Sequence, residues 1–466
     1  MMSNIAEELA GSFETDVLPV LMDYTRIECL SPSFDAEWEA HGEIGRAASL
    51  LAQWCASRSV AGAAIEIVAL PGRTPVLFAQ VPGDPARGTT LIYGHLDKQP
   101  PLGDWRPGLS AFEPVRDGDR LYGRGTADDG YATFAAFSAL EALERHGVAR
   151  GPVLVLIEAS EESGSPDLEA YLDLLAARIG SPGLVICLDS GCATYDRLWV
   201  TTSLRGVLVG TLSVSVLHEG VHSGHAGGIV PSSFRISREL LSRIEDERDG
   251  TILPPELHAE VPPHRRAQIR EVAELFGELA AGVFPTVEGL VLTGRDAAAR
   301  LEAGTWGPCL EVTGAAGLPE VKAGGNVLRP STTLKLSLRL PPNLDAEKAA
   351  DALRGLLLAE PPSGAHVEIE WEQPGQGWDS PQSAPWLEEV LGRASLEHFG
   401  APPAGLGLGG SIPFMASLGA RFPRCQFLAT GVLGPESNAH GPNEFLHLPT
   451  AVRVTAVVAD VLAAAP

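Results

Sequence analysis

The sequence contains no long apolar run and carries few basic residues. No segment approaches the roughly 20 consecutive apolar residues that a helix needs to span a bilayer, and residues 1–19 lack the basic and apolar regions of a secretory leader. We therefore expect a cytoplasmic protein without a membrane partner. The 59 Asp and Glu residues outnumber the 34 Lys and Arg residues, which gives a formal net charge of −25 at pH 7. Such a surface repels phosphate groups, so we expect no nucleic-acid partner.

Cysteine is scarce, and its spacing carries no motif. No two of the six cysteines form a CxxC pair, and they are spread over the whole sequence: Cys29, Cys55, Cys187, Cys192, Cys309 and Cys425. This pattern favours neither a disulfide framework nor a zinc site made of thiolates. We expect buried, reduced thiols.

The first part of the sequence alternates strand-like and helix-like segments. Continuous apolar runs over residues 89–94, 151–160 and 183–190 are typical of strands that are covered on both faces. Residues 132–146, between the first two runs, place apolar side chains at helical spacing. This alternation predicts an α/β fold with a mostly parallel sheet.

A second pattern begins near residue 205. Its strand-like segments alternate apolar and polar residues, and the order strand, helix, strand, strand, helix, strand covers residues 207–217, 231–246, 309–314, 332–340, 345–358 and 366–372. This order predicts a ferredoxin-like α+β domain. It is interrupted by an insertion at residues 249–307, with a helix expected near 265–281. The 466 residues thus divide into an outer domain, 1–205 and 373–466, and an inserted domain, 206–372.

Ionisable residues follow the predicted strands of the outer domain. The carboxyl ends of parallel strands meet along one edge of a sheet, where ligands bind. At these ends, and just before the helix at residue 132, the sequence has His95, Asp97, Asp128, Glu161, Glu162 and Asp189. Carboxylates and imidazoles suit zinc-type cations, and two cations about 3.5–4 Å apart need a bridging carboxylate. The set therefore predicts a two-metal site.

Spacing within this set indicates separate roles. In an extended segment His95 and Asp97 share one face, so the Asp97 carboxylate can accept the second ring N–H of His95 and orient it. Glu161 and Glu162 point in opposite directions if extended, which suits one metal ligand and one general base. A further ligand is expected where the first pattern returns, because the loop at 437–444 offers His440 after a strand.

Nine short segments, in this order, resemble the dinuclear zinc metallopeptidase family of carnosine dipeptidases, carboxypeptidase G and succinyl-diaminopimelate desuccinylase. They read YGHLDKQPP, LYGRGTADDG, IEASEESGS, CLDSG, TTSLRG, VHSGHAGGIVP, LSLRLPP, GGSIP and NAHGPNEF. The dipeptidase branch is the most similar. The resemblance extends from residue 35 to the C-terminus, and the insertion at 249–307 matches least well.

The resemblance implies a catalytic outer domain with two divalent metal ions, zinc first and manganese or cobalt as alternatives. His95 and Asp189 would hold one metal, and Glu162 and His440 the other. Asp128 would bridge the two. Asp97 would orient His95, and Glu161 would be the general base that takes a proton from the metal-bridging water.

The resemblance also assigns roles to the inserted domain, as a lid and dimerisation domain. His222 matches a histidine that stabilises the oxyanion, often in the partner subunit's site, which implies a homodimer. Arg339 matches an arginine that binds the substrate carboxylate. Ser411 lies on a glycine-rich turn like the family's substrate loop.

Two departures from the family pattern concern the surroundings of the site. The usual Asp-Asp-Lys-Gly is here Asp128-Asp129-Gly130-Tyr131, so a lysine beside the bridging carboxylate is missing. We expect altered local support without loss of metal. The Arg-Glu that often precedes Gly-Gly-Ser-Ile-Pro is here Gly407-Leu408, which removes two charges from the expected pocket wall.

The resulting prediction is a two-metal hydrolase that cleaves the amide bond of dipeptides or short peptides with a free carboxylate. An N-acyl or N-carbamoyl amino acid amidohydrolase would use the same metals and base, and the sequence does not separate the two. A third reading, of another class, is a catalytically silent binding protein. All five candidate ligands and the base are present, which argues against it.

Overall fold

The computed structural model of the chain describes residues 2–277, 284 and 286–466. These residues form two compact units. Unit 1 comprises the chain up to Thr202, Ser380–Leu406 and Ser417–Pro466, and unit 2 comprises Ser203–Asp379 and Gly407–Ala416. The glycine-rich segment Gly407–Ala416, which lies in the predicted outer domain, therefore groups with unit 2.

The main sheet is parallel in its centre and antiparallel at its edges. The strands run in the order β1-β2-β6-β3-β7-β17-β8-β15, with β16 also beside β8. Their bounds are β1 Ala64–Val68, β2 Val76–Val81, β3 Thr90–His95, β6 Val153–Glu158, β7 Leu184–Cys187, β8 Trp199–Leu204, β15 Trp378–Asp379, β16 Ala404–Leu408 and β17 Gln426–Ala429. The parallel pairs join β6, β3, β7 and β17. The predicted α/β class and the strands at 89–94, 151–160 and 183–190 are confirmed.

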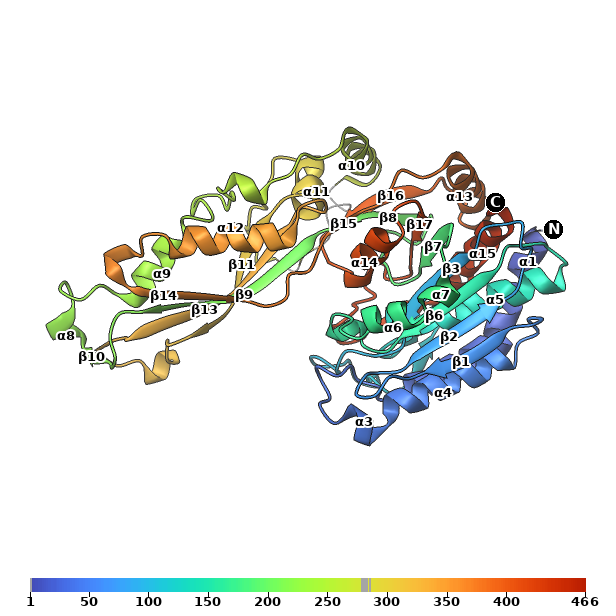
Figure 1. Cartoon of the computed structure of the whole chain (residues 1–466), viewed down its shortest axis with the longest axis horizontal. Coiled ribbons are helices and arrows are strands. Elements are labelled where there is room, and N and C mark those ends of the chain that lie inside the picture. Colours follow the sequence, from blue (N-terminus) through green and yellow to red (C-terminus); the bar gives the residue numbers. More distant parts are fainter. Residues whose placement is uncertain (1, 278–283, 285) are drawn as a thin grey trace. The chain divides into compact units, whose positions relative to one another are not determined.

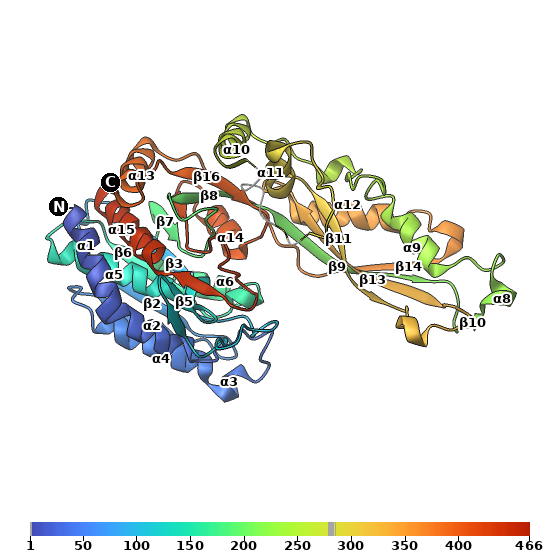
Figure 2. The ribbon, with the colours of Figure 1, turned by 180° about the vertical axis from the view of Figure 1, so that it is seen from behind.

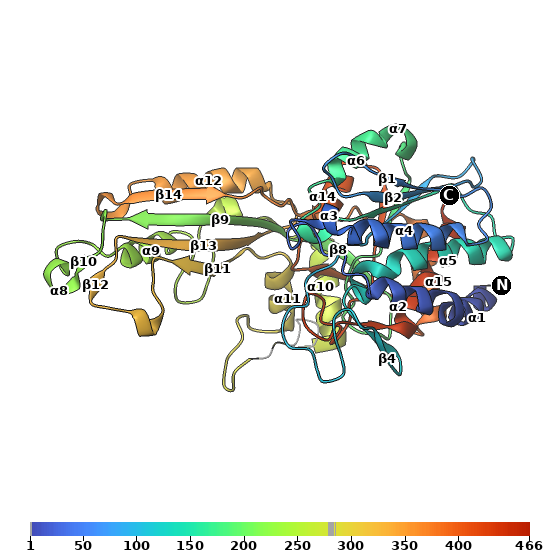
Figure 3. The ribbon, with the colours of Figure 1, turned by 90° about the horizontal axis from the view of Figure 1, so that it is seen from below.

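Helices cover both faces of this sheet in unit 1. α6 and α7 lie on the face opposite to α5 and α15, as Figure 3 shows, and α1, α4, α5 and α15 lie together in Figure 2. The helices of unit 1 are α1 Met2–Ser12, α2 Leu18–Thr25, α3 Trp38–His41, α4 Glu43–Ala56, α5 Tyr131–Arg145, α6 Leu168–Leu174, α7 Ala176–Ile179, α13 Pro385–His398 and α15 Leu448–Ala464. A further helix, α14 (Pro413–Arg421), begins in the segment assigned to unit 2 and ends in unit 1. The predicted helix at 132–146 is α5. It is buried on all sides from Tyr131 to Leu143, so it forms the centre of the apolar core.

A small three-stranded sheet joins two distant segments of unit 1. It consists of β4 (Val115–Asp117), β5 (Arg120–Tyr122) and β18 (Phe445–His447), in the order β18-β5-β4. Phe445 pairs with Tyr122 across it. The pairing brings the loop before β18 next to the segment that leads into α5.

Unit 2 has the predicted ferredoxin-like order. Its sheet runs β11-β13-β9-β14, antiparallel throughout, and α9 and α12 lie on one face of it (Figure 1). The bounds are β9 Gly206–Ser215, α9 Ser233–Leu241, β11 Cys309–Ala316, β13 Ser331–Leu340, α12 Ala346–Leu358 and β14 His366–Trp371. In β9 and β13 every second residue is buried, as expected for a sheet with one covered face.

Further elements extend this core. A two-stranded ribbon, β10 (Val221–His222) with β12 (Val327–Leu328), adjoins the short helix α8 (Ser223–Ala226). The insertion contains α10 (Pro263–Phe276) and α11 (Ala297–Thr305). The helix expected near 265–281 corresponds to α10, and residues 278–281 lie outside the described part of the chain.

All six cysteines are free, and the structure buries four of them, whereas Cys192 and Cys309 are half-buried. Within the described ranges, no helix is both long and apolar enough to cross a lipid bilayer.

A buried lysine holds the end of α2. The Lys98 ammonium is fully buried and donates to the backbone carbonyls of Tyr24, Thr25 and Ile27 at 2.8, 3.2 and 2.8 Å. Carbonyls at the end of a helix have no partner within the helix, so Lys98 satisfies groups that would otherwise be buried without a hydrogen bond. Burial lowers the pKa of Lys98.

We expect Lys98→Met to lower the free energy of unfolding by roughly 3 kcal/mol, because three buried carbonyls lose a charged donor. Urea denaturation followed by circular dichroism measures the change. Lys348→Met is the control, since Lys348 is exposed and pairs with Asp345 within one helical turn. Its effect should stay below about 0.5 kcal/mol, and equal effects of the two substitutions would contradict the role of Lys98.

Candidate metal centre

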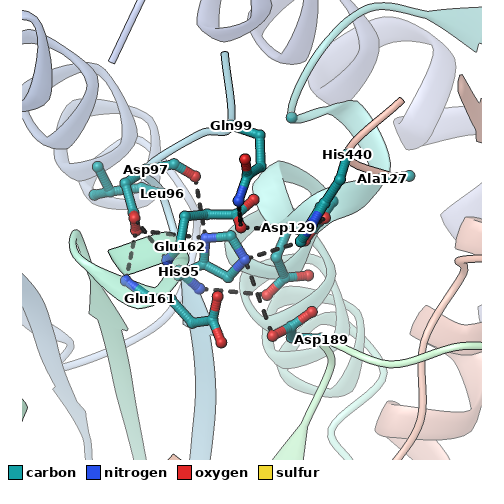
Figure 4. Close-up of polar contacts among 12 residues, drawn as sticks. His95, Leu96, Asp97, Gln99, Ala127, Asp129, Glu161, Glu162, Asp189 and His440 are labelled. Carbon is teal, nitrogen blue, oxygen red and sulfur yellow. Dashed lines mark hydrogen bonds and ion pairs between the residues drawn. The ribbon is translucent and has the colours of Figure 1, made fainter. Parts of the chain in front are cut away.

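Three neighbouring parallel strands supply most of the predicted ligands. His95 is the last residue of β3, Glu161 and Glu162 form a 3-10 turn after β6, and Asp189 follows β7. Because β6, β3 and β7 are adjacent and parallel, their carboxyl ends meet at one edge of the sheet. Figure 4 shows the side chains of His95, Glu162, Asp189 and His440 converging on a common centre.

The remaining ligands come from the segments that the small sheet joins. Asp128 lies in a short π-helical turn (Thr126–Gly130) that leads into α5, and it is buried. His440 lies in the loop before β18 and has a left-handed backbone, with φ +62°. Its side chain is 54% exposed, so this ligand forms the open side of the centre.

Two groups of three side chains can each hold a cation, and Asp128 belongs to both. The first is His95, Asp128 and Asp189, and the second is Asp128, Glu162 and His440. In the first, His95 Nε2 lies 3.3 Å from Asp128 Oδ1 and 4.0 Å from Asp189 Oδ2. In the second, His440 Nε2 lies 3.1 Å from both Asp128 Oδ2 and Glu162 Oε2. The two oxygens of one carboxylate therefore face different histidines, as a bridging ligand requires.

Asp97 organises the centre without facing the common point. Its two carboxylate oxygens accept the backbone N–H groups of Glu161 and Glu162, at 3.1 and 3.0 Å. The Nδ1 atom of His95 lies 3.1 Å from the Asp97 carbonyl oxygen and 3.5 Å from its carboxylate. A carbonyl only accepts hydrogen bonds, so Nδ1 carries a proton, and Nε2, which faces Asp128, is the nitrogen that can bind a metal.

The acidic groups repel one another in this buried setting. Burial raises the pKa of Glu161 well above its ordinary value, and the charge of Asp189 raises it further. Burial likewise raises the pKa of Asp189 to about 7, and it raises the pKa of Glu162. Ionised carboxylates at this density need cations nearby.

The two histidines stabilise the shared carboxylate. Burial alone would raise the pKa of Asp128, but hydrogen bonds with His440 and His95 bring it below its ordinary value. Hydrogen bonds to Asp128 and Glu162 raise the pKa of His440 to about 11. The positive charge that the imidazoles supply here is the charge that a bound cation would supply, so the donor set fits two divalent ions with oxygen and nitrogen ligands.

A buried ion pair, not predicted from the sequence, supports both Asp128 and the His440 loop. Arg124 Nη1 donates to Glu444 Oε2 at 2.6 Å, and Nη2 donates to the Gly441 carbonyl at 2.8 Å. Both side chains are buried. The other oxygen of Glu444 accepts, at 3.0–3.3 Å, the backbone N–H groups of Gly125, Ala127 and Asp128. Both residues stand in quoted segments, LYGRG and NAHGPNEF, but their pairing is a tertiary contact.

Gln99 is a second residue that the sequence reasoning missed. Its Nε2 donates to Glu162 Oε2 at 2.7 Å, the oxygen that also faces His440. Its place four residues after His95 in HLDKQ was the available signal. Gln99 therefore fixes the orientation of one predicted metal ligand.

The missing lysine beside Asp128 has a steric explanation. A Cβ atom at Gly130 would lie 2.3 Å from the Gly125 carbonyl oxygen and 2.3 Å from the Tyr24 ring, so this backbone has no room for a side chain. The next residue, Tyr131, donates from its hydroxyl to the Leu188 carbonyl at 2.6 Å. This bond ties the start of α5 to the segment that carries Asp189.

The other predicted site residues lie in unit 2. His222 is exposed at the end of β10, and its Nδ1 accepts the backbone N–H of Gly224 at 3.1 Å. The Arg339 guanidinium, on β13, donates to Ser411 Oγ at 3.3 Å. Burial, followed by the charge of Arg205, lowers the pKa of Arg339.

Comparison with known protein families decides the affiliation of the chain. The family described as peptidase family M20/M25/M40 matches residues 91–464. The chain belongs to this peptidase family. Membership confirms the resemblance found in the sequence and the class of metallopeptidase.

Individual M20 relatives agree with this assignment. The chain is 27% identical over 380 residues to a cysteinylglycine-S-conjugate dipeptidase of Corynebacterium striatum, covering 79% of each chain. It is 32% identical over 207 residues to human Beta-Ala-His dipeptidase, covering 42% of this chain and 39% of that protein. The solved structure of the dipeptidase Dug1p from Saccharomyces cerevisiae has a TM-score of 0.78 at 20% identity, over 99% of this chain and 98% of that chain, which shows the same fold.

We expect Glu444→Gln to weaken metal binding about 10- to 100-fold, the usual effect of losing a residue that supports a ligand. The neutral amide cannot balance the positive charge of Arg124, and its NH₂ group cannot accept hydrogen bonds from the backbone N–H groups. Competition with a chromogenic chelator measures the affinity for zinc. Glu436→Gln is the matched control, because Glu436 lies on the same loop as Glu444 and also pairs with an arginine, Arg120 of β5, but is 73% exposed. Unchanged affinity in Glu444→Gln would argue against this support.

Proposed function

We propose that this M20 protein is a two-metal dipeptidase that hydrolyses the amide bond of dipeptides with a free carboxylate. The observation that carries the proposal is the pair of ligand groups that share Asp128, with Glu161 adjacent to Glu162. The dipeptidase names of the relatives support the substrate class. Zinc is proposed as the metal, because two imidazoles and three carboxylates are ligands that zinc accepts.

Bound divalent cations would supply positive charge that makes a water molecule acidic and polarises the substrate carbonyl. His95 and Asp189 would hold one ion, Glu162 and His440 the other, with Asp128 shared. Asp97 keeps the two glutamates and His95 in place through the contacts described above.

Glu161 acts as the general base and then the general acid. Within the described residues its carboxylate accepts no hydrogen bond, whereas its backbone N–H is held by Asp97. Burial raises the pKa of Glu161, which favours acceptance of the proton from the attacking water. The same carboxyl group then delivers that proton to the leaving amine.

Residues of unit 2 recognise the substrate. The Nδ1 atom of His222 accepts a backbone N–H, so Nε2 carries a proton and can donate a hydrogen bond to the developing oxyanion. Arg339 is half-buried, and its one hydrogen-bond partner among the described side chains is the Ser411 hydroxyl. Its guanidinium therefore remains available for the bidentate pairing that carboxylates favour.

We expect Glu161→Gln to reduce kcat on the order of 10²- to 10⁴-fold, the usual contribution of a general base, with the metal retained. Glu162→Gln, one residue away, should instead lose metal. Metal content by mass spectrometry and turnover of a panel of dipeptides and N-acyl amino acids measure both variants. Metal loss in Glu161→Gln would assign that residue as a ligand.

The same panel separates the alternatives. Cleavage of acylated substrates only would favour the N-acyl or N-carbamoyl amidohydrolase. Absence of turnover with zinc, manganese and cobalt would favour the silent binding protein. The absence of nucleic-acid and membrane partners and the cytoplasmic location stay predictions.

We also propose that unit 2 forms a homodimer. Exposed apolar side chains gather in its segments near β10 and β12, where Ile229 is 81% exposed and Val321 is 98% exposed. The edge strand β11 also exposes Val312, and β13 is its one neighbour in the described sheet. An edge strand beside apolar side chains is a surface that another chain covers, and a second copy agrees with the role expected for His222.

Light scattering coupled to size exclusion should give twice the mass of one chain. We expect the double substitution Val321→Asp and Ile229→Asp to shift the protein toward the monomer, because buried unpaired carboxylates oppose association. Leu174→Asp is the control, since Leu174 is an exposed apolar residue of unit 1. A wild-type monomer at micromolar concentration would refute the dimer.

A further inference from the structure

Arg205 connects three parts of unit 2 through its side chain and backbone. It lies between β8 and β9, in the TTSLRG segment. Its Nε donates to the Gly409 carbonyl at 3.1 Å, and its Nη1 donates to the Gly307 carbonyl at 3.1 Å and the Ala303 carbonyl at 3.5 Å. Its own carbonyl accepts the Ser411 hydroxyl at 2.5 Å. One residue thus holds the turn at 409–411 and the end of α11 in the insertion.

The end of α11 packs directly on bare glycine backbone. A Cβ atom at Gly407 would lie 2.5 Å from Ser203 Oγ and 3.0 Å from Thr305 Cβ. A Cβ atom at Gly409 would lie 2.8 Å from the Gly304 carbonyl oxygen. The end of α11 therefore packs against the backbone of residues 407–409, and a side chain at position 407 or 409 would displace α11 from this segment.

The turn at 409–411 also orients a second arginine, Arg339. Ser411 Oγ accepts a hydrogen bond from Arg339 at 3.3 Å while it donates to the Arg205 carbonyl. Among the described residues, no carboxylate forms an ion pair with Arg205 or Arg339. Two half-buried guanidinium groups without a counter-ion favour an anionic ligand.

We propose that Arg205 is a positioning residue of the subsite for the substrate carboxylate. It fixes the turn at 409–411 against α11, so that Ser411 aims Arg339, and its charge adds to that of Arg339. The insertion then has a defined role, because the carbonyls of Ala303 in α11 and of Gly307 just after it hold Arg205 in this position. The proposal rests on the proposed function, since the carboxylate is that of a dipeptide.

A purely structural role makes a different prediction. Arg205 also caps the carbonyls at the end of α11, and loss of this cap would lower stability in the same way for every ligand. A role in the subsite instead weakens ligands with a free carboxylate and spares their C-terminal amides. Discrimination between the two ligand forms is therefore the readout that separates the two roles.

The test uses full-length, metal-loaded protein and a dipeptide analogue whose amide is reduced to an amine, as the free acid and as the C-terminal amide. Isothermal titration calorimetry gives both dissociation constants. Arg205→Lys keeps the charge but cannot reach three carbonyls at once. We expect it to weaken binding of the acid about tenfold, within the range for a lost charged hydrogen bond, and to leave the amide within about twofold of wild type.

Arg243→Lys is the matched control. Arg243 also donates to three backbone carbonyls of unit 2, those of Leu356, Ala359 and Glu360, and it has no part in the proposed site. Gly407→Ala is a second variant, which changes no charge but displaces α11 from the segment at 407–409. It should weaken binding of the acid and spare the amide, as Arg205→Lys does. Equal weakening of acid and amide in Arg205→Lys, or the same selective loss in Arg243→Lys, would overturn the proposal.

Turnover of the unmodified dipeptide, measured in the same experiment, distinguishes failure of the Arg205 role from failure of the proposed dipeptidase function. If the wild-type protein hydrolyses the dipeptide and Arg205→Lys prefers the acid over the amide as strongly as wild type does, the role of Arg205 is refuted and the proposed function stands. A wild-type protein that hydrolyses no dipeptide but prefers the acid refutes the proposed function and leaves the subsite. A wild-type protein that binds acid and amide equally refutes the subsite.

Discussion

The concentration of negative charge at one edge of the sheet is the constraint on which the rest of unit 1 depends. Asp128, Glu162 and Asp189 lie together, largely out of solvent, beside the imidazoles of His95 and His440, and Glu161 directly precedes Glu162. Carboxylates in this setting repel one another and lose hydration. The arrangement is stable as an ionised set only when cations occupy it, so the fold and the metal chemistry are linked.

The surrounding residues hold these carboxylates in place through individual hydrogen bonds. Asp97 binds the backbone beside both glutamates, Gln99 donates to Glu162, and Glu444 binds the backbone beside Asp128. Each contact comes from a segment far away in the sequence from the group that it orients. Arg124, itself buried, neutralises Glu444, so the support adds no uncompensated charge to the centre.

Unit 2 has the opposite electrostatic character near its predicted substrate residues. Among the residues that the structure describes, Arg339 and Arg205 donate to hydroxyl and carbonyl oxygens and to the Cys309 sulfur, and to no acidic side chain. The predicted metal ligands of unit 1 are thus mostly acidic, whereas unit 2 carries two arginines at its predicted substrate residues. In the proposed function, the first set would hold the metal ions and the second would recognise an anionic group.

The sequence alone was sufficient for the strands, the inserted ferredoxin-like order and the candidate ligands. These features depend on local patterns, such as the apolar runs that became β3, β6 and β7, with polar residues directly after them. Adjacent parallel strands must end at one edge, so convergence of His95, Glu162 and Asp189 followed from the class of fold.

Tertiary structure alone decided the contacts that no periodicity encodes. The Arg124–Glu444 pair spans 320 residues, and Arg205 reaches carbonyls of the insertion and of a turn about 200 residues away. The grouping of Gly407–Ala416 with unit 2 has the same origin. A side chain's partner depends on where the folded backbone brings distant segments, and a single sequence records the residue types without recording those distances.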